Sequence, residues 1–559
     1  MIRFQHLHTH FLLPFSIDKE AVCEDHMGIW ARHPHWITGV TEWLNLPAEG
    51  VGAKLVERLG KWKRTPYTRY DIDSPAYQDM VFFHSYVRRV FFDTTEPPEE
   101  GQGPESLLQF YQIPLEEQNL WFVAEDAKGR SASVRVTDLR LHLYANTIGV
   151  LSIGVEAFNI SASEGLWINE MMRKVYPSSR RQLREGRMPV RLAFVLEDGQ
   201  GQQDVLVEER FERAEMVSFH PPLAATIRAL LYFADYEQQE YEPVLDERMV
   251  VYTYVAVDPA TIPEGFVDSR EYEVLRSRIL YVDRWGEDFR YDTAFTKKLM
   301  LRQQYRRWAH QGTWYGSTTY SNVTCCIGQF DCDEHELAEG FLIHRMYRSR
   351  YLAIALITLF YRVTLLDFAE RTALVSRQLY RDAEGARISS ENIRLASELR
   401  SDFLHFSNYW YFDELANKDE ESEHFRKQVH EYRIDVMKNE IEVEIDKLNE
   451  SLHNYYQFRN TEAVNRLAML SLILGAGAVV TGFFGMNFSG AFGQWVFQPS
   501  RTAISLHWVS LSFVILFATA TLLFGAYVVA SNWRDYRESL LPRWWLARTE
   551  RGARSLKRS

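Results

Sequence analysis

The sequence predicts an α/β cytoplasmic domain followed by a helical region, a long stalk helix and two C-terminal transmembrane helices, and so an α-helical membrane protein. Three observations predict this order. Apolar and polar residues mostly alternate over residues 134–155, as in a β-hairpin. A charged segment with heptad spacing, residues 424–466, contains neither Gly nor Pro. Two apolar stretches, residues 467–484 and 503–531, contain no Asp, Glu, Lys or Arg.

The composition of the whole chain excludes several classes of protein. Of its 559 residues, 46% are hydrophobic and 14% are aromatic, which excludes a disordered chain. The net charge of −12 disfavours a nucleic-acid partner, because a negative balance repels phosphate. Four cysteines are few for a secreted protein of this length held by disulfides, so we expect a reducing compartment. The mean hydropathy of −0.29 is typical of a soluble protein, but the apolar residues are unevenly distributed.

The N-terminal part divides into two expected regions. Residues 1–130 are expected to form an N-terminal extension of unknown role, and residues 131–340 an α/β domain. The hairpin of residues 134–155 begins the second region. Further strand patterns lie at residues 191–196, 205–207 and 249–257, with helical patterns at residues 166–175 and 221–236.

Metal-binding and catalytic patterns in this part are sparse. His6, His8 and His10 occupy alternate positions and would share one face of a strand, but no companion ligands are evident in the sequence, so a structural role is favoured. A zinc site built from the three neighbouring cysteines is disfavoured, because Cys325 and Cys326 are adjacent and lack the usual ligand spacing. The chain has no phosphate-binding glycine motif and no nucleophile elbow, so an enzyme is not expected. No organic cofactor is evident.

The helical region is expected over residues 341–423. Its run of eleven apolar residues, 351–361, is bounded by arginines and is too short to cross a bilayer, so it predicts a buried helix. Acidic residues gather at positions 419–423, where we expect a solvated turn between helices. The stalk helix follows at residues 424–466. Because Ile434, Ile441 and Ile445 continue the heptad spacing, the simplest expectation is one continuous helix that runs into the membrane.

The membrane region has four expected parts. They are the first transmembrane helix (residues 467–487), an outer loop (residues 488–502), the second transmembrane helix (residues 503–531) and a basic tail (residues 532–559). The tail carries seven arginines and a lysine, and positive flanks stay in the cytoplasm, so both termini are expected on the cytoplasmic side of an inner or plasma membrane. Two buried core helices are the alternative to two spans.

The first span ends in Gly485-Met486-Asn487. A Gly-Met-Asn tripeptide at the outer end of the penultimate span, before a short outer loop, resembles the CorA family of divalent-cation channels. The resemblance covers about residues 425–535 and, by architecture, residues 130–535. It implies a homopentamer that transports divalent cations, most often Mg²⁺, with Mg²⁺ also acting as a regulatory ligand.

The resemblance also implies roles for single residues. A ring of Asn487 side chains would present amide oxygens to the water shell of Mg²⁺, which sheds its water reluctantly. Gly485 would permit the backbone turn beside this ring, and Met486 would pack to fix it. The alternative for Asn487 is a helix C-cap at the membrane surface. Glu450 and Asp446 on the stalk would bind a regulatory cation, the alternative being a solvated helix face.

Two features leave the function open. The outer loop has no carboxylate and carries Arg501, so transport of Zn²⁺, Co²⁺ or Ni²⁺ is the nearest rival to Mg²⁺ transport. The chain is also much longer than the resemblance requires. A second hypothesis is therefore a membrane-anchored sensor or effector, whose enlarged cytoplasmic part binds an unidentified small-molecule regulator.

Overall fold

The computed structural model describes most of the chain. The described residues are 1–17, 44–45, 47–66, 80–93, 107–115, 118–177, 179–198, 200–211, 222–244, 248–283, 292–328, 342–384 and 388–485, with seven single residues between 512 and 527. The chain divides into two units, Met1–Leu448 and Asn449–Ser559, each described by itself.

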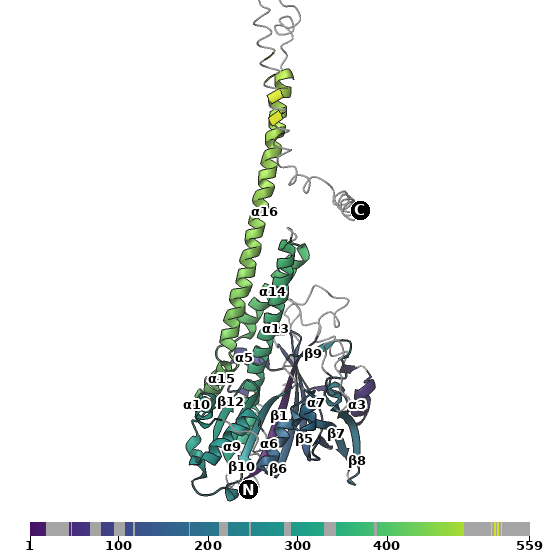
Figure 1. The fold of residues 1–559 in the computed structure, drawn as a ribbon, viewed down its shortest axis with the longest axis vertical. Coiled ribbons are helices and arrows are strands. Elements are labelled where there is room, and N and C mark those ends of the chain that lie inside the picture. The colour runs from purple at the N-terminus through teal and green to yellow at the C-terminus, as the bar shows by residue number, and fades with distance from the viewer. Residues whose placement is uncertain are drawn as a thin grey trace, which may run out of the picture. The chain divides into compact units, whose positions relative to one another are not determined.

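The first unit is built on a mixed sheet of thirteen strands (Figure 1). Its main path runs β11-β12-β13-β10-β1-β6-β5-β4-β7-β8, with β2, β3 and β9 paired beside it. The pairing of β10 with β13 is parallel and the other strand pairs are antiparallel. The strands are β1 (Arg3–Ile17), β2 (Lys63–Arg64), β3 (Leu108–Ile113), β4 (Asn119–Asp126), β5 (Ser131–Tyr144), β6 (Ile148–Ser161), β7 (Pro189–Glu197), β8 (Gln203–Arg210), β9 (Tyr241–Pro243), β10 (Val250–Val257), β11 (Gln304–Tyr305), β12 (Trp314–Ser317) and β13 (Ser321–Ile327).

The strand β1 lies in the middle of this sheet. It pairs with β6 from Arg3↔Ser161 to Ser16↔Ile148, and with β10 on its other side. The structure therefore differs from the expected division at residue 130, because the first seventeen residues belong to the same sheet as β5 and β6. Local sequence patterns do not show this, since β1 and β6 are more than a hundred residues apart.

The expected hairpin of residues 134–155 is present as β5 and β6. The turn between them holds Thr147 at φ 71°, a left-handed conformation that is uncommon outside glycine. Strands β7, β8 and β10 lie at the other predicted strand positions. Helices α6 and α8 overlap the predicted helical segments, although α8 is much shorter than expected.

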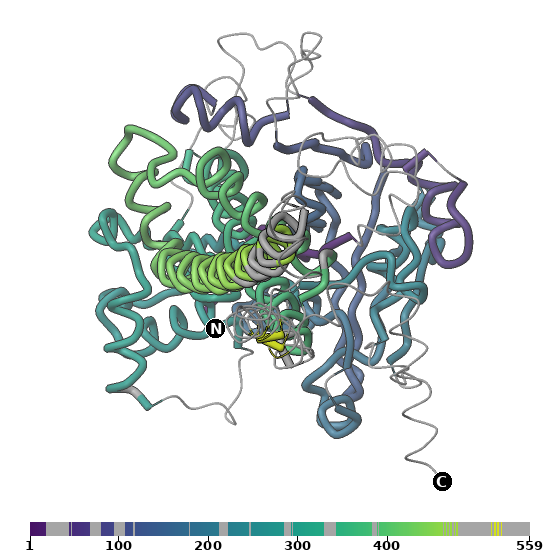
Figure 2. Tube along the Cα trace, turned by 90° about the horizontal axis from the view of Figure 1, so that it is seen from above, coloured from purple at the N-terminus to yellow at the C-terminus, as the bar shows by residue number. Residues whose placement is uncertain are grey.

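Helices cover both faces of the sheet. The α-helices are α3 (Ala53–Leu59), α5 (Ser85–Phe91), α6 (Ala162–Met172), α7 (Arg180–Arg184), α8 (Ala225–Leu230), α9 (Arg270–Tyr281), α10 (Thr293–Gln303), α12 (Leu342–Arg348), α13 (Arg350–Glu384), α14 (Ser390–His405), α15 (Asp419–Tyr432) and α16 (Ile434–Gly485). On one face, Thr9 of β1 donates a hydrogen bond to Asn169 of α6. On the other face, the Tyr347 hydroxyl of α12 donates to the carbonyl oxygen of His8. Figure 2 shows the later elements of the unit, coloured teal to green, beside the earlier strands.

The long helix α13 is a core element of the first unit. The helical stretch Leu342–Asp382 has, by length and composition, the apolar character of a membrane span, with a mean hydropathy of 1.8 in its most apolar window. However, 72% of that window is buried inside the protein, as in the core helix of a globular domain. Because Leu352, Leu359 and Phe360 are almost fully buried, the prediction of a buried helix over residues 351–361 is confirmed.

The expected stalk is not one helix. Helix α15 ends at Tyr432, Arg433 adopts a left-handed conformation (φ 55°, ψ 34°), and α16 begins at Ile434. The prediction of a continuous helix from residue 424 is therefore wrong at this residue. From Ile434 onward the heptad pattern is confirmed, because Ile434, Ile441 and Ile445 are buried while their charged neighbours are exposed.

The acidic residues 419–423 do not form a solvated turn. Asp419, Glu420 and Glu421 lie in the first turn of α15, where negative charge is favourable beside the helix N-terminus, and Glu423 follows in the same helix. Glu421 is 1% exposed and lies 3.0 Å from Nε of Arg350 on α13. The carboxylate of Glu420 accepts hydrogen bonds from the Tyr351 hydroxyl (2.8 Å) and the Trp308 indole (3.0 Å). These contacts tie α15 to α13 and to the edge of the sheet.

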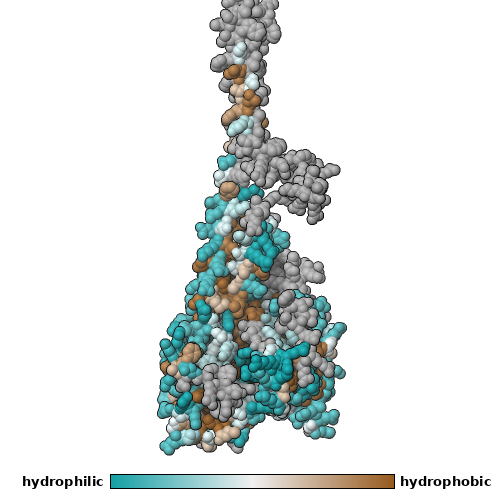
Figure 3. All heavy atoms as spheres, viewed as in Figure 1, coloured by the Kyte–Doolittle hydropathy of each residue, from teal (hydrophilic) through white to brown (hydrophobic). Residues whose placement is uncertain are grey.

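The second unit holds the end of α16. This helix has 52 residues and continues without interruption to Gly485. Figure 3 shows hydrophobic side chains recurring along α16, and Val464, Leu467 and Leu474 are more than half exposed in the single chain. The seven described residues between 512 and 527 are helical. The outer loop, most of the expected second span and the tail lie outside the described residues.

Candidate functional site

The expected pore motif is described only at its first residue. Gly485 is the last residue of α16, while Met486 and Asn487 lie outside the described residues. The structure thus gives the helix that leads to the motif, and the ion ring stays a prediction.

The two expected regulatory ligands lie on α16. Asp446 and Glu450 are exposed and four residues apart, so they share one face of the helix. Within the part of the chain that the structure describes, neither belongs to a group of three or more metal-ligating side chains. A cation bound here would therefore need ligands from outside these residues, such as a neighbouring copy of the chain.

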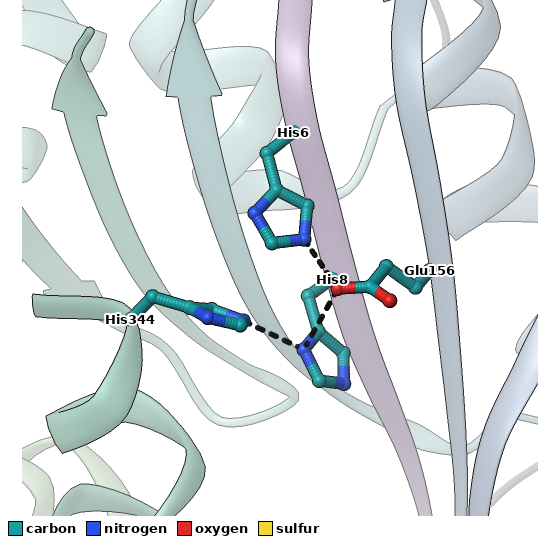
Figure 4. A group of neighbouring side chains, drawn as sticks. All are labelled: His6, His8, Glu156 and His344. Atoms are coloured by element: carbon teal, nitrogen blue, oxygen red, sulfur yellow. Dashed lines mark hydrogen bonds and ion pairs between the residues drawn. The ribbon is translucent and has the colours of Figure 1, made fainter. Parts of the chain in front are cut away.

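A different group of ligands is assembled in the first unit. Strand β1 places His6, His8 and His10 on one face, as their alternate spacing predicts, and all three are buried. Glu156 is the partner of His8 across the β1–β6 pair, and His344 comes from α12 (Figure 4). No sequence pattern points to Glu156 or His344, because strand register and helix packing bring them to the histidines.

The four side chains His6, His8, Glu156 and His344 converge closely. Nε2 of His6 lies 2.6 Å from Oε1 of Glu156, and Nδ1 of His8 lies 2.9 Å from Nε2 of His344 (Figure 4). Nδ1 of His8 lies 4.0 Å from the same Glu156 oxygen. One nitrogen or oxygen of each residue lies within 4.8 Å of the corresponding atom of every other. We call these four residues the histidine–glutamate cluster.

A second group adjoins it. Nδ1 of His10 lies 3.6 Å from Oδ1 of Asp138 and 3.2 Å from the Ser152 hydroxyl. The Nε2 atom of His10 is buried and makes no hydrogen bond to the described residues. Asp138 also pairs with Nε of Arg140 at 2.7 Å, so its charge is already partly compensated.

Burial keeps His8, His10 and His344 neutral. Burial first, and then the nearby rings of His10 and His344, hold the pKa of His8 well below its usual range. Burial, the His6 ring and the guanidinium of Arg348 lower the pKa of His344 to about 3. Burial also lowers the pKa of His10 to about 4, although Asp138 opposes this effect. At neutral pH these rings each present a nitrogen lone pair rather than a positive charge.

Aromatic side chains fix the rings of the cluster. The Phe158 ring stacks on His6 with centroids 4.5 Å apart, and the Tyr254 ring meets His6 edge-on at 5.4 Å. Tyr347 packs edge-on against His8 and stacks on Tyr252 with centroids 4.5 Å apart. Large side chains from β6, β10 and α12 thus pack against the rings of the cluster and restrict their movement.

The two cysteines that the structure describes carry no metal site. Cys325 and Cys326 are buried on β13, and the Tyr254 hydroxyl lies 3.2 Å from Sγ of Cys326. Burial raises the pKa of the Cys326 thiol to about 12, so the neutral thiol is favoured.

A cavity of about 580 Å³ lies where α16 begins. Its wall comes from α10, α15, α16 and the segment before α15. Charged side chains of both signs line it: Arg302, Asp413, Arg426, Arg433 and Asp435. Its place beside the break at Arg433 makes it a candidate site for a charged small molecule.

Comparison with known proteins matches part of the C-terminal third of the chain to a known family. Residues 385–529 match the family model of the CorA-like Mg²⁺ transporter protein. The matched region includes α14, α15 and α16, the Gly-Met-Asn motif and most of the second uncharged stretch. The resemblance predicted from the motif is confirmed for this region, and proteins of this family are membrane-located transporters rather than enzymes. No curated protein and no solved structure matches the chain.

Proposed function

We propose that the protein conducts divalent cations, Mg²⁺ before others, across an inner or plasma membrane, and that its N-terminal domain controls this flux. The match of residues 385–529 to the CorA-like family carries the proposal. Divalent cation transport follows from that match at the level of the family, whereas the ion, the pore residues and the gating are our proposals.

The properties of α16 support a pore-lining role. It is one helix from Ile434 to Gly485, the first residue of the Gly-Met-Asn motif. Gly475 and Gly477 on this helix have open space where a Cβ would stand. Small residues let membrane helices approach closely and leave room for water between them. Asn487, two residues beyond the helix, would present its amide oxygen to the hydrated ion.

A single chain cannot enclose a pore with two spans, so the proposal requires an oligomer, which we propose to be a homopentamer. Apolar residues on the exposed surface of α16 support it. Val436 and Val443 are exposed by 43% and 51% and stand seven residues apart, which places them on one face. Burying such a face between copies is favourable by roughly 25 cal/mol per Å² of apolar surface.

The decisive experiment measures ion flux in vesicles containing the purified full-length protein. With a Mg²⁺-sensitive dye inside, Asn487→Ala is expected to abolish uptake while leaving insertion and oligomer size unchanged. The matched control is Asn454→Ala, which makes the same change at an exposed position of α16. Mg²⁺ uptake by Asn487→Ala at the rate of the unchanged protein would overturn the pore assignment.

The same vesicles identify the ion. We expect Mg²⁺ uptake to persist when Zn²⁺, Co²⁺ or Ni²⁺ is present at equal concentration. If one of these ions is taken up faster and excludes Mg²⁺, the transported ion is that metal. Because the outer loop has no carboxylate to concentrate cations, Arg501→Glu is expected to raise uptake at low ion concentration.

A second candidate function is supported by the cavity beside Arg433. A charged small molecule bound there would contact α10, α15 and α16 at once and bias the junction of the last two helices. Thermal-shift measurements on the full-length protein with nucleotides and with Mg²⁺ separate the two functions. Stabilisation by a nucleotide alone, without ion flux in vesicles, would favour a membrane-anchored sensor.

A further inference from the structure

We propose that the histidine–glutamate cluster of His6, His8, Glu156 and His344 binds a transition-metal cation of the zinc class, at a site distinct from the path of the transported ion.

The chemistry of the donors selects the class of metal. Three imidazole nitrogens and one carboxylate oxygen suit Zn²⁺, and also Co²⁺ and Ni²⁺, which favour nitrogen ligands. Mg²⁺ demands oxygen ligands in octahedral geometry and usually keeps several waters. A buried site with three histidines therefore discriminates against Mg²⁺, the ion that we propose for the pore.

The distances fit a small tetrahedral ion. Zinc bonds to histidine nitrogen and carboxylate oxygen are about 2.0–2.2 Å, which places neighbouring ligand atoms about 3.3–3.5 Å apart. The contacts of 2.6 Å, 2.9 Å and 4.0 Å lie on both sides of this value. Shifts of less than about 1 Å in side chains would bring the ligand atoms to the separation that zinc requires.

The protonation of the rings permits metal binding without a change of charge. In the 2.9 Å contact of His8 with His344, one of the two nitrogens must carry a proton. When a metal binds, that proton moves to the other nitrogen of the same neutral ring. For His8 the proton on Nε2 would point to the Thr137 hydroxyl, which lies 3.4 Å away and itself donates to Asp138 at 3.0 Å. A histidine–hydroxyl–carboxylate chain of this kind orients a metal-ligating ring.

The site rests on rigid elements. His6 and His8 lie on the central strand and Glu156 on its neighbour, so their Cα positions are set by the sheet register. His344 lies on α12, which is fixed to β1 by the hydrogen bond of 2.9 Å from Tyr347 to the carbonyl of His8. Ligands held in this way require little ordering when the ion arrives.

The charges near the site balance. Glu156 and Asp138 supply negative charge, while Arg140 and Arg348 supply positive charge, and Arg348 acts on His8 and on His344. A divalent ion in the cluster would therefore be paired with the carboxylate of Glu156, because Asp138 is already paired with Arg140 at 2.7 Å.

The adjoining group of His8, His10 and Asp138 is the weaker choice. It has three ligands instead of four and shares His8 with the cluster, so both cannot use the same nitrogen. Its carboxylate is committed to Arg140 at 2.7 Å. Asp138 is better suited to orient the ligands of the first site than to bind a metal of its own.

Metal bonds at this site would join two parts of the first unit. Three ligands belong to the sheet and the fourth, His344, belongs to α12, which is followed after one residue by α13. An ion held by all four residues would fix the start of the helical layer to β1 and β6. The N-terminal domain would thereby respond to a metal different from the transported one.

The experiment uses the full-length protein purified in detergent, stripped with a chelator and then exposed to Zn²⁺. Metal content after gel filtration and the melting temperature are measured for the unchanged protein and for His344→Gln and Glu156→Gln. The matched control is His424→Gln, because His424 is also a buried histidine on a helix but lies outside the cluster. We expect one zinc ion per chain in the unchanged protein and the control, and at least a tenfold loss of affinity in the other two variants.

Several outcomes would overturn the proposal. The cluster is a hydrogen-bonded packing network only if the unchanged protein binds no zinc, or if all variants bind it equally. If His344→Gln and Glu156→Gln fail to fold, Co²⁺ added to the unchanged protein decides the question: visible absorption bands of a tetrahedral ion support the site, and their absence contradicts it. Asn487→Ala is expected to bind zinc normally, so failure of the pore and failure of this site are distinguishable.

Discussion

The two ends of the chain differ in the groups that we propose for binding cations. At the N-terminal end, buried imidazoles and one carboxylate converge on a point inside a sheet-based domain. At the C-terminal end, a family match and the Asn487 motif predict a ring of neutral amides that holds an ion together with its water. The first arrangement suits a metal stripped of water and held in place, and the second suits an ion that must pass on.

The two sites also differ in whether their residues can be recognised from the sequence or only from the structure. Asn487 belongs to a tripeptide that can be recognised in the sequence alone, because its expected role depends on its position at the end of a helix. His344 and Glu156 can be recognised as possible ligands only in the structure. There, β1, β6 and α12 bring together residues that are up to 338 positions apart in the sequence. Variants that affect flux alone, or folding alone, test whether the two regions are independent of each other.

The largest expected effect on folding is at the buried ion pair between Arg350 and Glu421. Arg350 is only 6% exposed, and Glu421→Ala leaves its guanidinium without its ionic partner. Removing one member of a buried ion pair typically destabilises a protein by about 3–5 kcal/mol. We expect the melting temperature of the full-length protein to fall strongly. In contrast, Asn487→Ala should abolish flux with little change in melting temperature.

The matched control for this variant is Glu414→Ala. Glu414 also pairs with an arginine, Arg426 at 3.1 Å, but both side chains are more than half exposed. An exposed pair contributes about 0–1 kcal/mol, so its loss should hardly be measurable. Equal effects of the two substitutions would mean that the contact between α13 and α15 does not stabilise the helical layer.

An intermediate effect is expected from acidification. Burial, assisted by Arg350, lowers the pKa of His424 to about 3, and the ring packs among Tyr305, Tyr315 and Tyr351. The unfolded chain protonates this histidine below a pH of about 6.5, while the folded protein keeps it neutral. Stability is therefore lost as the pH falls from about 6.5 toward 3, at up to about 1.4 kcal/mol per pH unit.

The pH dependence has its own control. His424→Gln removes the titrating group, so the loss of stability between pH 6.5 and pH 5 should become smaller by about 2 kcal/mol. Denaturant unfolding of the full-length protein at both pH values measures it. If the variant loses as much stability on acidification as the unchanged protein, His424 is not a source of the pH dependence.

Part of the fold could be predicted from the sequence, namely the elements that local patterns determine. The hairpin of β5 and β6 shows in the alternation of residues 134–155, and the buried face of α16 shows in the spacing of Ile434, Ile441 and Ile445. The place of β1 in the sheet could not be predicted, because its pairing with β6 joins distant segments. The acidic residues 419–423 look solvated in the sequence, and only the packing of α13 beside α15 explains the burial of Glu421.

The candidate sites show the same limit. The alternate spacing of His6, His8 and His10 correctly predicts that they share a face, but no sequence pattern supplies the third and fourth ligands. The sequence alone therefore favours a structural role for the three histidines. Conversely, the Gly-Met-Asn motif leads to the family directly, although Met486 and Asn487 lie outside the described residues.

The smallest expected effect lies at Arg433, where α15 and α16 meet. A residue with a Cβ is strained in the left-handed conformation by about 1–2 kcal/mol, and glycine is not, although glycine loses more entropy on folding. The break persists because its neighbours are held: Tyr432 accepts a hydrogen bond from Asn322 at 3.1 Å, and Tyr411 donates one to Asp435 at 2.7 Å.

Arg433→Gly is therefore expected to stabilise the protein by about 1 kcal/mol in denaturant unfolding. Arg433→Ala removes the same side chain but keeps the Cβ, so it should not stabilise. Equal effects of the two substitutions would show that backbone strain at this residue is not what the glycine relieves, and a loss of stability in Arg433→Gly alone would show that the break depends on the arginine.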